Sequence, residues 1–246
     1  MNPAPGPFDI ALFVALTLIS ALLDWRWLYP ALERASAAGT PGVRVRFYSL
    51  GIAWEWVFTA AAIALWLAHG RPWSALWLAP PTTLRAVASL VVAAGGVTMI
   101  WMQHRGLVAG DMSRARRHLT GAEAMLPRTS SERVGFAALS VTAGICEEIL
   151  FRGFVPWVLA AWVGPVPACV LGSLLFGFAH YYLGQDAAIR AAIAGALFTC
   201  VVVLTGSLLP AIVIHAAADL SAGEIGFRMF TRDIGQESQP AAPAEA

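Results

Sequence analysis

The chain has 246 residues, of which 58% are hydrophobic and 13% are charged, and its formal net charge is +1. Soluble domains carry about 25% charged residues, so this composition excludes an ordinary soluble domain and indicates an integral membrane protein. The even balance of charge gives no indication of a nucleic-acid partner. Because the chain is rich in alanine and its basic residues are arginines, we expect a multi-pass protein of a bacterial inner or plasma membrane.

A helix needs about 20 mostly apolar residues to cross a bilayer. Stretches of this kind occur, in chain order, at 8–29, 47–67, 84–101, 134–153, 168–183, 187–205 and 208–227. The piece at 155–163 is too short to cross alone, and it is either a broken extension of the fourth span or a re-entrant piece. The predicted fold class is all-α: a polytopic transmembrane helical bundle of about seven spans with a polar intramembrane cavity.

The connections divide the chain into three parts. Residues 1–132 are expected to form N-terminal membrane helices with a basic connecting loop, 133–230 a catalytic helical core, and 231–246 a disordered tail. The basic stretch at 103–133 is either an interfacial helix or a solvated loop. Arginines gather in the first and third long connections, which places both on one side, and the positive-inside rule makes that side cytoplasmic.

The most informative stretch is the fourth span, where Glu147, Glu148 and Arg152 interrupt an apolar run. Ionisable groups at membrane depth are costly unless they are paired or face a wet cavity, so they indicate a functional site. Glu148 and Arg152 are four apart and can pair, whereas Glu147 and Glu148 point about 100° apart and are not expected to aim at one point. Glu147 is then left without a partner, which suits a general base. The alternative is a structural ion network of all three.

Two further motifs follow. Phe176 and His180 are four apart at the end of the fifth span, so the phenyl ring is expected to pack behind the imidazole. His215 and Asp219 share a face of the seventh span, with only alanines between them. Such a pair binds a metal, forms an oriented acid–base pair, or is simply a buried histidine satisfied by its own aspartate.

Polar side chains spread over three apolar helices each need a partner. We therefore expect four of them to face one shared cavity that holds and deprotonates a water for hydrolysis: Glu147, His180, His215 and Asp219. Glu55 stands between two tryptophans in the second span. We interpret it as a polar residue facing the bundle rather than as part of that cavity.

Three short motifs thus occur in order on successive apolar segments, namely Glu147-Glu148-x-x-x-Arg152, Phe176-x-x-x-His180 and His215-x-x-x-Asp219. From about residue 133 to 228 the chain resembles the CPBP family of intramembrane proteases, which includes CAAX prenyl endopeptidases and bacteriocin-processing, Abi-type enzymes. The resemblance implies a helical bundle with a polar cavity that opens to the cytoplasmic side and to the bilayer. It also implies peptide-bond hydrolysis by an activated water.

By the family pattern, Glu147 and His180 would activate the water. His215 and Asp219 would stabilise the oxyanion or bind a metal. Structural support would come from the remaining motif residues, Glu148, Arg152 and Phe176. The family accepts Asn or Asp at the last position. An ionised Asp only accepts hydrogen bonds, so Asp219 would orient His215, ligate a cation or stay protonated.

The cofactor and the substrate remain open at this point. The site either holds a divalent metal such as zinc, with ligands drawn from Glu147, His180, His215 and Asp219, or activates the water without one. The expected partner is a membrane-associated peptide or lipoprotein, and a prenylated substrate is not required. The alternative to an endopeptidase is a non-catalytic membrane protein, with an immunity, scaffold or transport role, that uses the same cavity for binding.

Overall fold

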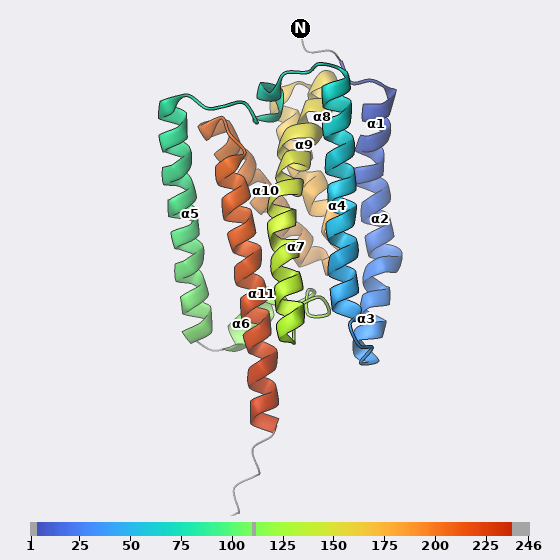
Figure 1. The fold of residues 1–246 in the computed structure, drawn as a ribbon, viewed down its shortest axis with the longest axis vertical. Helices are drawn as coiled ribbons and strands as arrows, with labels where there is room; N and C mark the ends of the chain where they lie inside the picture. The colour runs from blue at the N-terminus through green and yellow to red at the C-terminus, as the bar shows by residue number, and fades with distance from the viewer. Residues whose placement is uncertain (1–3, 110–111, 238–246) are drawn as a thin grey trace, which may run out of the picture.

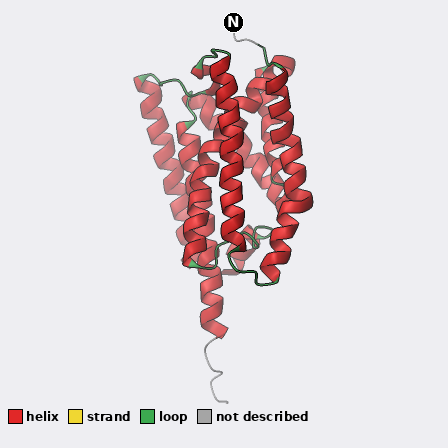
Figure 2. Ribbon diagram, turned by 45° about the vertical axis from the view of Figure 1, so that its right-hand side comes forward, coloured by secondary structure: helices red, strands yellow, loops and turns green. Residues whose placement is uncertain are grey.

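The computed structural model describes residues 4–109 and 112–237, and within these ranges the chain is helical, with no strand (Figure 1; Figure 2). The first rod consists of α1 (Pro7–Val14), α2 (Ala21–Leu23) and α3 (Tyr29–Ala37), joined by π-helical turns at Ala15–Ser20 and Asp24–Leu28. Next come α4 (Val43–Ala68), a 3-10 turn at Trp73–Leu76, α5 (Thr83–Ala109) and α6 (Met112–Leu119). The second half contains α7 (Ser130–Glu148), a π-helical turn at Ile149–Phe154, α8 (Val155–Val163), α9 (Pro165–Ala179), a 3-10 turn at Tyr181–Leu183, α10 (Gln185–Thr205) and α11 (Leu209–Glu237).

Five helical rods in the described part of the chain are long and apolar enough to cross a membrane: Pro7–Ala37, Val43–Ala68, Thr83–Val108, Ser130–Val163 and Gln185–Thr205. The bundle also contains the shorter apolar α9 and the long α11, which lies between α5 and α7 (Figure 1). The predicted all-α membrane bundle is therefore confirmed. The piece at 155–163 is an extension of the fourth span, because the π-helical turn leads from α7 into α8 without a break.

The sequence-based prediction places the start of the disordered tail too early in the chain. α11 continues to Glu237, so residues 231–237 are helical rather than disordered. The physical reason is that the sequence offers no helix-breaking proline before Pro240. The rest of the expected tail, 238–246, lies outside the described residues.

The span that carries the first motif lies at the centre of the bundle. In the rod Ser130–Val163, 56% of the most apolar window is buried, against 22% or less in each of the other four candidate spans. α7 packs against α4 on one side and α11 on the other, while α8 packs against α9. The charged residues of the fourth span are therefore surrounded by protein and do not face lipid.

α9 is too short to cross the bilayer, and this determines where His180 lies. Its 15 residues span about 22 Å, less than the roughly 30 Å of a hydrocarbon core. His180 directly follows its last residue. His180 at the end of α9 and His215 early in α11 lie close to each other, since the ring of Phe176 packs against both imidazoles.

The two basic connections lie at one end of the bundle, as the arginine bias predicts. The α3–α4 connection and the segment that contains α6 are both at the lower end in Figure 1. α6 exposes Arg114, Arg116 and Arg117 and buries Leu119. This amphipathic helix favours the interfacial helix over the solvated loop for this part of the 103–133 stretch.

A buried ion pair joins the first rod to the loop after α4 at the opposite end. Arg71 donates two hydrogen bonds, of 2.6 and 2.8 Å, to the carboxylate of Asp9, and both side chains are almost fully buried. The guanidinium also lies over the ring of Trp157 from α8, 4.3 Å from its centroid. A buried arginine is costly unless it is paired, and these contacts compensate for that cost. Arg71 thus holds three segments together and has a structural role.

α7 and α11 approach each other most closely at Gly144. A Cβ placed there would lie 2.8 Å from the Cβ of Ala216 and 3.0 Å from the carbonyl oxygen of Ile212. In α5, a Cβ on Gly96 would lie 2.5 Å from Cδ1 of Ile214, whereas a Cβ on Gly95 would meet nothing within 4 Å. The absence of a side chain at 144 therefore lets α11 bring its polar residues up to α7.

We expect Gly144→Ala to lower the free energy of unfolding by about 1–3 kcal/mol, because the added methyl group forces two packed backbones apart. The matched control is Gly95→Ala, where the methyl group points into open space and alanine favours the helix. Thermal unfolding of both variants in the same detergent is the measurement. Equal midpoints for the two variants would contradict the close approach of α7 and α11.

Candidate active site

The site is built around the imidazole of His215, which is buried and held by α7. Its Nδ1 lies 2.7 Å from Oε1 of Glu148, and Arg152 lies 3.0 Å from the same oxygen. An ionised carboxylate paired with arginine can only accept, so Nδ1 of His215 is the donor. The hydrogen bond therefore fixes the tautomer and leaves Nε2 directed into the site.

Two further carboxylates face Nε2 of His215. Oε2 of Glu147 lies 3.8 Å away, and Oδ2 of Asp219 lies 3.6 Å away. Both separations are longer than a hydrogen bond and are of the size that a bridging water spans. Oε2 of Glu147 is buried and makes no hydrogen bond to another described group. The sequence predicts that Glu147 has no partner, but it lies within ion-pair distance of His215, whereas Glu148 and Arg152 form the predicted pair.

The sequence-based geometry of Glu147 and Glu148 is partly wrong. They do point different ways, but they reach the two nitrogens of one imidazole ring, that of His215. An imidazole presents its nitrogens on different edges, so carboxylates about 100° apart can flank it. The helix also changes to a π-helical turn directly after Glu148. Such turns are frequent at functional sites and have no simple sequence signal.

His180 is fixed in a different way from His215. Its Nδ1 lies 2.8 Å from the carbonyl oxygen of Phe176 and must donate to it, which leaves Nε2 as an acceptor. The rings of Phe176 and His180 are 4.5 Å apart, as the spacing predicts, and Arg152 stacks on the phenyl ring at 4.1 Å. Phe176 therefore connects His180 to the Glu148–Arg152 pair through direct contacts.

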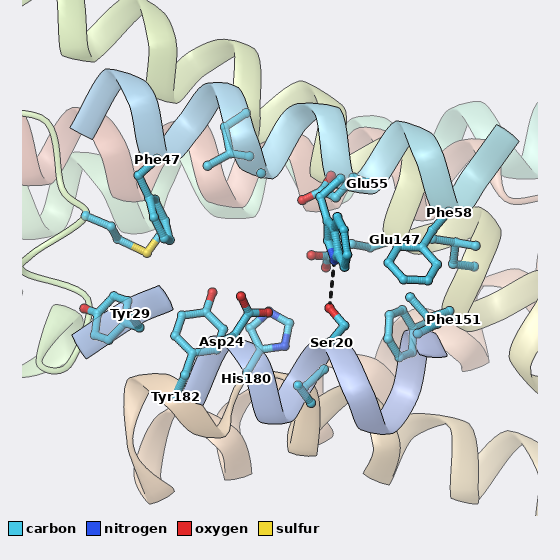
Figure 3. A pocket seen from close by; sticks show the side chains of 18 residues that line it. Ser20, Asp24, Tyr29, Phe47, Glu55, Phe58, Glu147, Phe151, His180 and Tyr182 are labelled. Carbon is cyan, nitrogen blue, oxygen red and sulfur yellow. Dashed lines mark hydrogen bonds between the residues drawn. The ribbon is translucent and has the colours of Figure 1, made fainter. Parts of the chain in front are cut away.

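Glu147 and His180 line one cavity with a volume of about 140 Å³ (Figure 3). Its walls come from the first rod, α4, α7 and the end of α9. Further polar side chains around it are Ser20, Asp24, Tyr29, Glu55 and Tyr182. His215 and Asp219 adjoin the cavity through Glu147. Two of the four predicted site residues, Glu147 and His180, therefore line the cavity, and the other two, His215 and Asp219, lie beside Glu147 without lining it.

Glu55 corrects one sequence-based interpretation. It belongs to the cavity, and its carboxylate interacts electrostatically with Glu147, Asp219 and Asp24. Figure 3 shows the Glu55 and Glu147 side chains projecting into the cavity from their two helices. A single acidic residue between tryptophans gives no signal of which face of α4 it occupies, because the apolar residues of α4 are spread around the helix.

The segment that precedes α7 closes one end of this cavity. Met125 is part of its lining, and the carbonyl oxygen of Met125 accepts a hydrogen bond of 2.5 Å from Tyr48. Arg44 donates to the carbonyl oxygen of Ala124 at 2.9 Å, and Tyr29 donates to that of Gly121. Side chains of the first rod and α4 therefore hold the α6–α7 connection over the site.

The predicted metal ligands do not form a metal-binding group in this structure. Among the described residues, no three His, Cys, Asp or Glu side chains lie close enough together to hold a metal ion. One nitrogen of each histidine is already engaged, by Glu148 in His215 and by a backbone carbonyl in His180. The choice between a divalent metal such as zinc and a metal-free site, which the sequence leaves open, therefore stays open.

Comparison with known proteins addresses the segment that holds the motifs. Residues 129–221 match the family described as type II CAAX prenyl endopeptidase Rce1-like. No curated protein and no solved structure matches the chain. The matched segment begins at the N-cap of α7 and includes all seven predicted site residues, whereas Asp24 and Glu55 lie outside it. Residues 129–221 therefore match an Rce1-like family model, in agreement with the protease family that the three motifs indicated.

Proposed function

We propose that the protein is an intramembrane endopeptidase that hydrolyses a peptide bond of a membrane-associated or lipidated peptide. One observation carries the proposal: Glu147, whose Oε2 makes no hydrogen bond within the described chain, and His180, whose Nδ1 is held by a carbonyl oxygen, line the same cavity. Both are proton acceptors, and together they hold and deprotonate a water. The Rce1-like match, which is to a protease family, supports this chemistry.

The chain's own residues account for each step. Glu147 takes a proton from a water positioned by Nε2 of His180, and the hydroxide oxygen bonds to the carbonyl carbon of the substrate. The proton on Glu147 then passes to the amide nitrogen as the C–N bond breaks, which gives a free amine and a carboxylic acid, and the acid releases its proton to solvent to become a carboxylate. His215, when protonated at Nε2, donates to the oxyanion, and Glu148 holds its ring in place.

Asp219 has a different role from His215. An ionised aspartate offers only acceptor oxygens, so it does not bind an oxyanion directly. At 3.6 Å from Nε2 of His215, its carboxylate stabilises the protonated imidazole. Bound zinc, if the loaded protein holds it, would supply a Lewis acid at the same place.

An apolar groove beside the cavity supports a lipidated substrate. It has a volume of about 410 Å³ and lies between the first rod and α4. Its apolar walls are made by Leu23, Trp27, Leu28, Leu50 and Trp54, and it shares Ser20, Asp24 and Trp54 with the catalytic cavity. Trp27, Leu28 and Leu50 are exposed. A lipid chain in this groove would place an attached peptide next to Glu147.

We expect Glu147→Gln to reduce cleavage by about 10²–10⁴-fold, because the amide cannot accept the proton of the water. The assay uses purified protein in lipid nanodiscs with a membrane-associated lipopeptide. Glu33→Gln is the control, since Glu33 is exposed and outside the cavity. His180→Ala should behave as Glu147→Gln does, with both variants folded. Full activity in both variants would contradict the proposed site, whereas no cleavage by the wild-type protein would support the non-catalytic alternative.

Removal of metal distinguishes a water activated by a bound metal from a water activated by side chains alone. Because the described side chains form no three-ligand group, we expect cleavage to persist, within about twofold, after dialysis against a strong chelator. Loss of cleavage with recovery on adding zinc would contradict this expectation and establish a metalloprotease. Metal content of the purified protein, measured by mass spectrometry, provides a second readout that does not depend on the substrate.

A further inference from the structure

The arginine-rich end of the bundle contains a pocket that the proposed proteolysis does not use. It has a volume of about 580 Å³ and is separate from the catalytic cavity. α5 contributes Gln103, Gly106 and Leu107, and the remaining lining residues are arginines, Arg114 and Arg117 from α6 and Arg190 from α10. Among the residues that the structure describes, no acidic side chain lines it. Guanidinium groups from two separate helices thus converge on one space.

Arg114 and Arg190 have no ion pair with a carboxylate anywhere in the described part of the chain, and both side chains are exposed. Arg117 already takes part in an interaction within the chain. Converging arginines repel one another, and an anion relieves that repulsion. The planar guanidinium group suits phosphate oxygens, to which it donates paired hydrogen bonds.

The position of the pocket identifies the source of the phosphate. Arg190 lies in the second turn of α10, close to the end of an apolar span, where a charged side chain reaches for the membrane surface. α5 exposes Trp101 and Met102 just before the lining residue Gln103, and Arg105 stacks on Trp101 at 4.8 Å. Exposed tryptophan next to charged residues is typical of the boundary between hydrocarbon and headgroups. The pocket therefore opens at headgroup level.

We propose that this pocket binds the phosphate headgroup of an anionic lipid, with Arg114 and Arg190 as the main phosphate ligands and Arg117 beside them. Leu107 supplies an apolar floor for the start of the lipid's chains. Basic pockets between transmembrane helices on the cytoplasmic side are known to select anionic headgroups. α6 lies between α5 and the segment that closes the catalytic cavity, so a lipid bound here also fixes the start of that segment.

The test measures binding of phosphatidylglycerol to the full-length protein in phosphatidylcholine nanodiscs. We expect Arg114→Gln/Arg190→Gln to weaken binding by about 10- to 30-fold, since each arginine near the headgroups contributes about fivefold. The control is Arg26→Gln/Arg46→Gln, which removes the same charge from exposed arginines outside the pocket and should change binding less than twofold. All four positions are exposed, so the thermal unfolding midpoints in phosphatidylcholine alone should be equal.

Two outcomes would overturn the proposal. Equal weakening in the control pair would show general attraction of a basic surface for anionic lipid. Competition by inorganic phosphate at millimolar concentration would show a site for free phosphate and not for a lipid. Neither outcome depends on proteolysis, so failure here leaves the proposed peptidase activity untouched.

Discussion

The hydrogen bond from His215 to Glu148 is the interaction on which the rest of the site depends. It joins α11 to α7 inside the bundle, and Arg152 holds the carboxylate from the next turn of the same rod. With Nδ1 committed to this bond, Nε2 has to face Glu147. The close approach of the two helices at Gly144 makes the bond possible. Of the two adjacent carboxylates, Glu148 thus has a structural role and Glu147 faces the free edge of the imidazole.

The fold and the membership of the site are largely readable from the sequence, for a simple physical reason. Charged side chains in apolar runs need partners, so Glu147, His180, His215 and Asp219 stand out in the sequence. Glu147 and His180 line one cavity, and Glu147 and Asp219 lie within 4 Å of His215. The contacts between individual atoms cannot be predicted from the sequence, because they depend on how each helix is rotated about its axis. The sequence pairs Glu148 only with its own neighbour, and not with an imidazole from another helix.

Other features of the site depend on the exact length of a helix or on which face of a helix a residue occupies, and hydropathy predicts neither. The fifth apolar segment looks long enough to span, yet α9 ends before His180 because the chain turns there through a 3-10 helix. Glu55 and Asp24 join the cavity although they lie outside the segment that matches the Rce1-like family. The N-terminal half therefore contributes a wall of the site, and differences in that wall are a natural source of substrate preference.

The most direct measurement is a double-mutant cycle between Glu148 and His215, with thermal and denaturant unfolding of Glu148→Gln, His215→Ala and the double variant. A charge-assisted hydrogen bond contributes about 1.5–3 kcal/mol, so a coupling free energy of this size is predicted, and each single variant should already lose most of what the double variant loses. Additive losses, with a coupling near zero, would mean that Glu148 does not hold His215, and the arrangement of the site around that bond would be wrong.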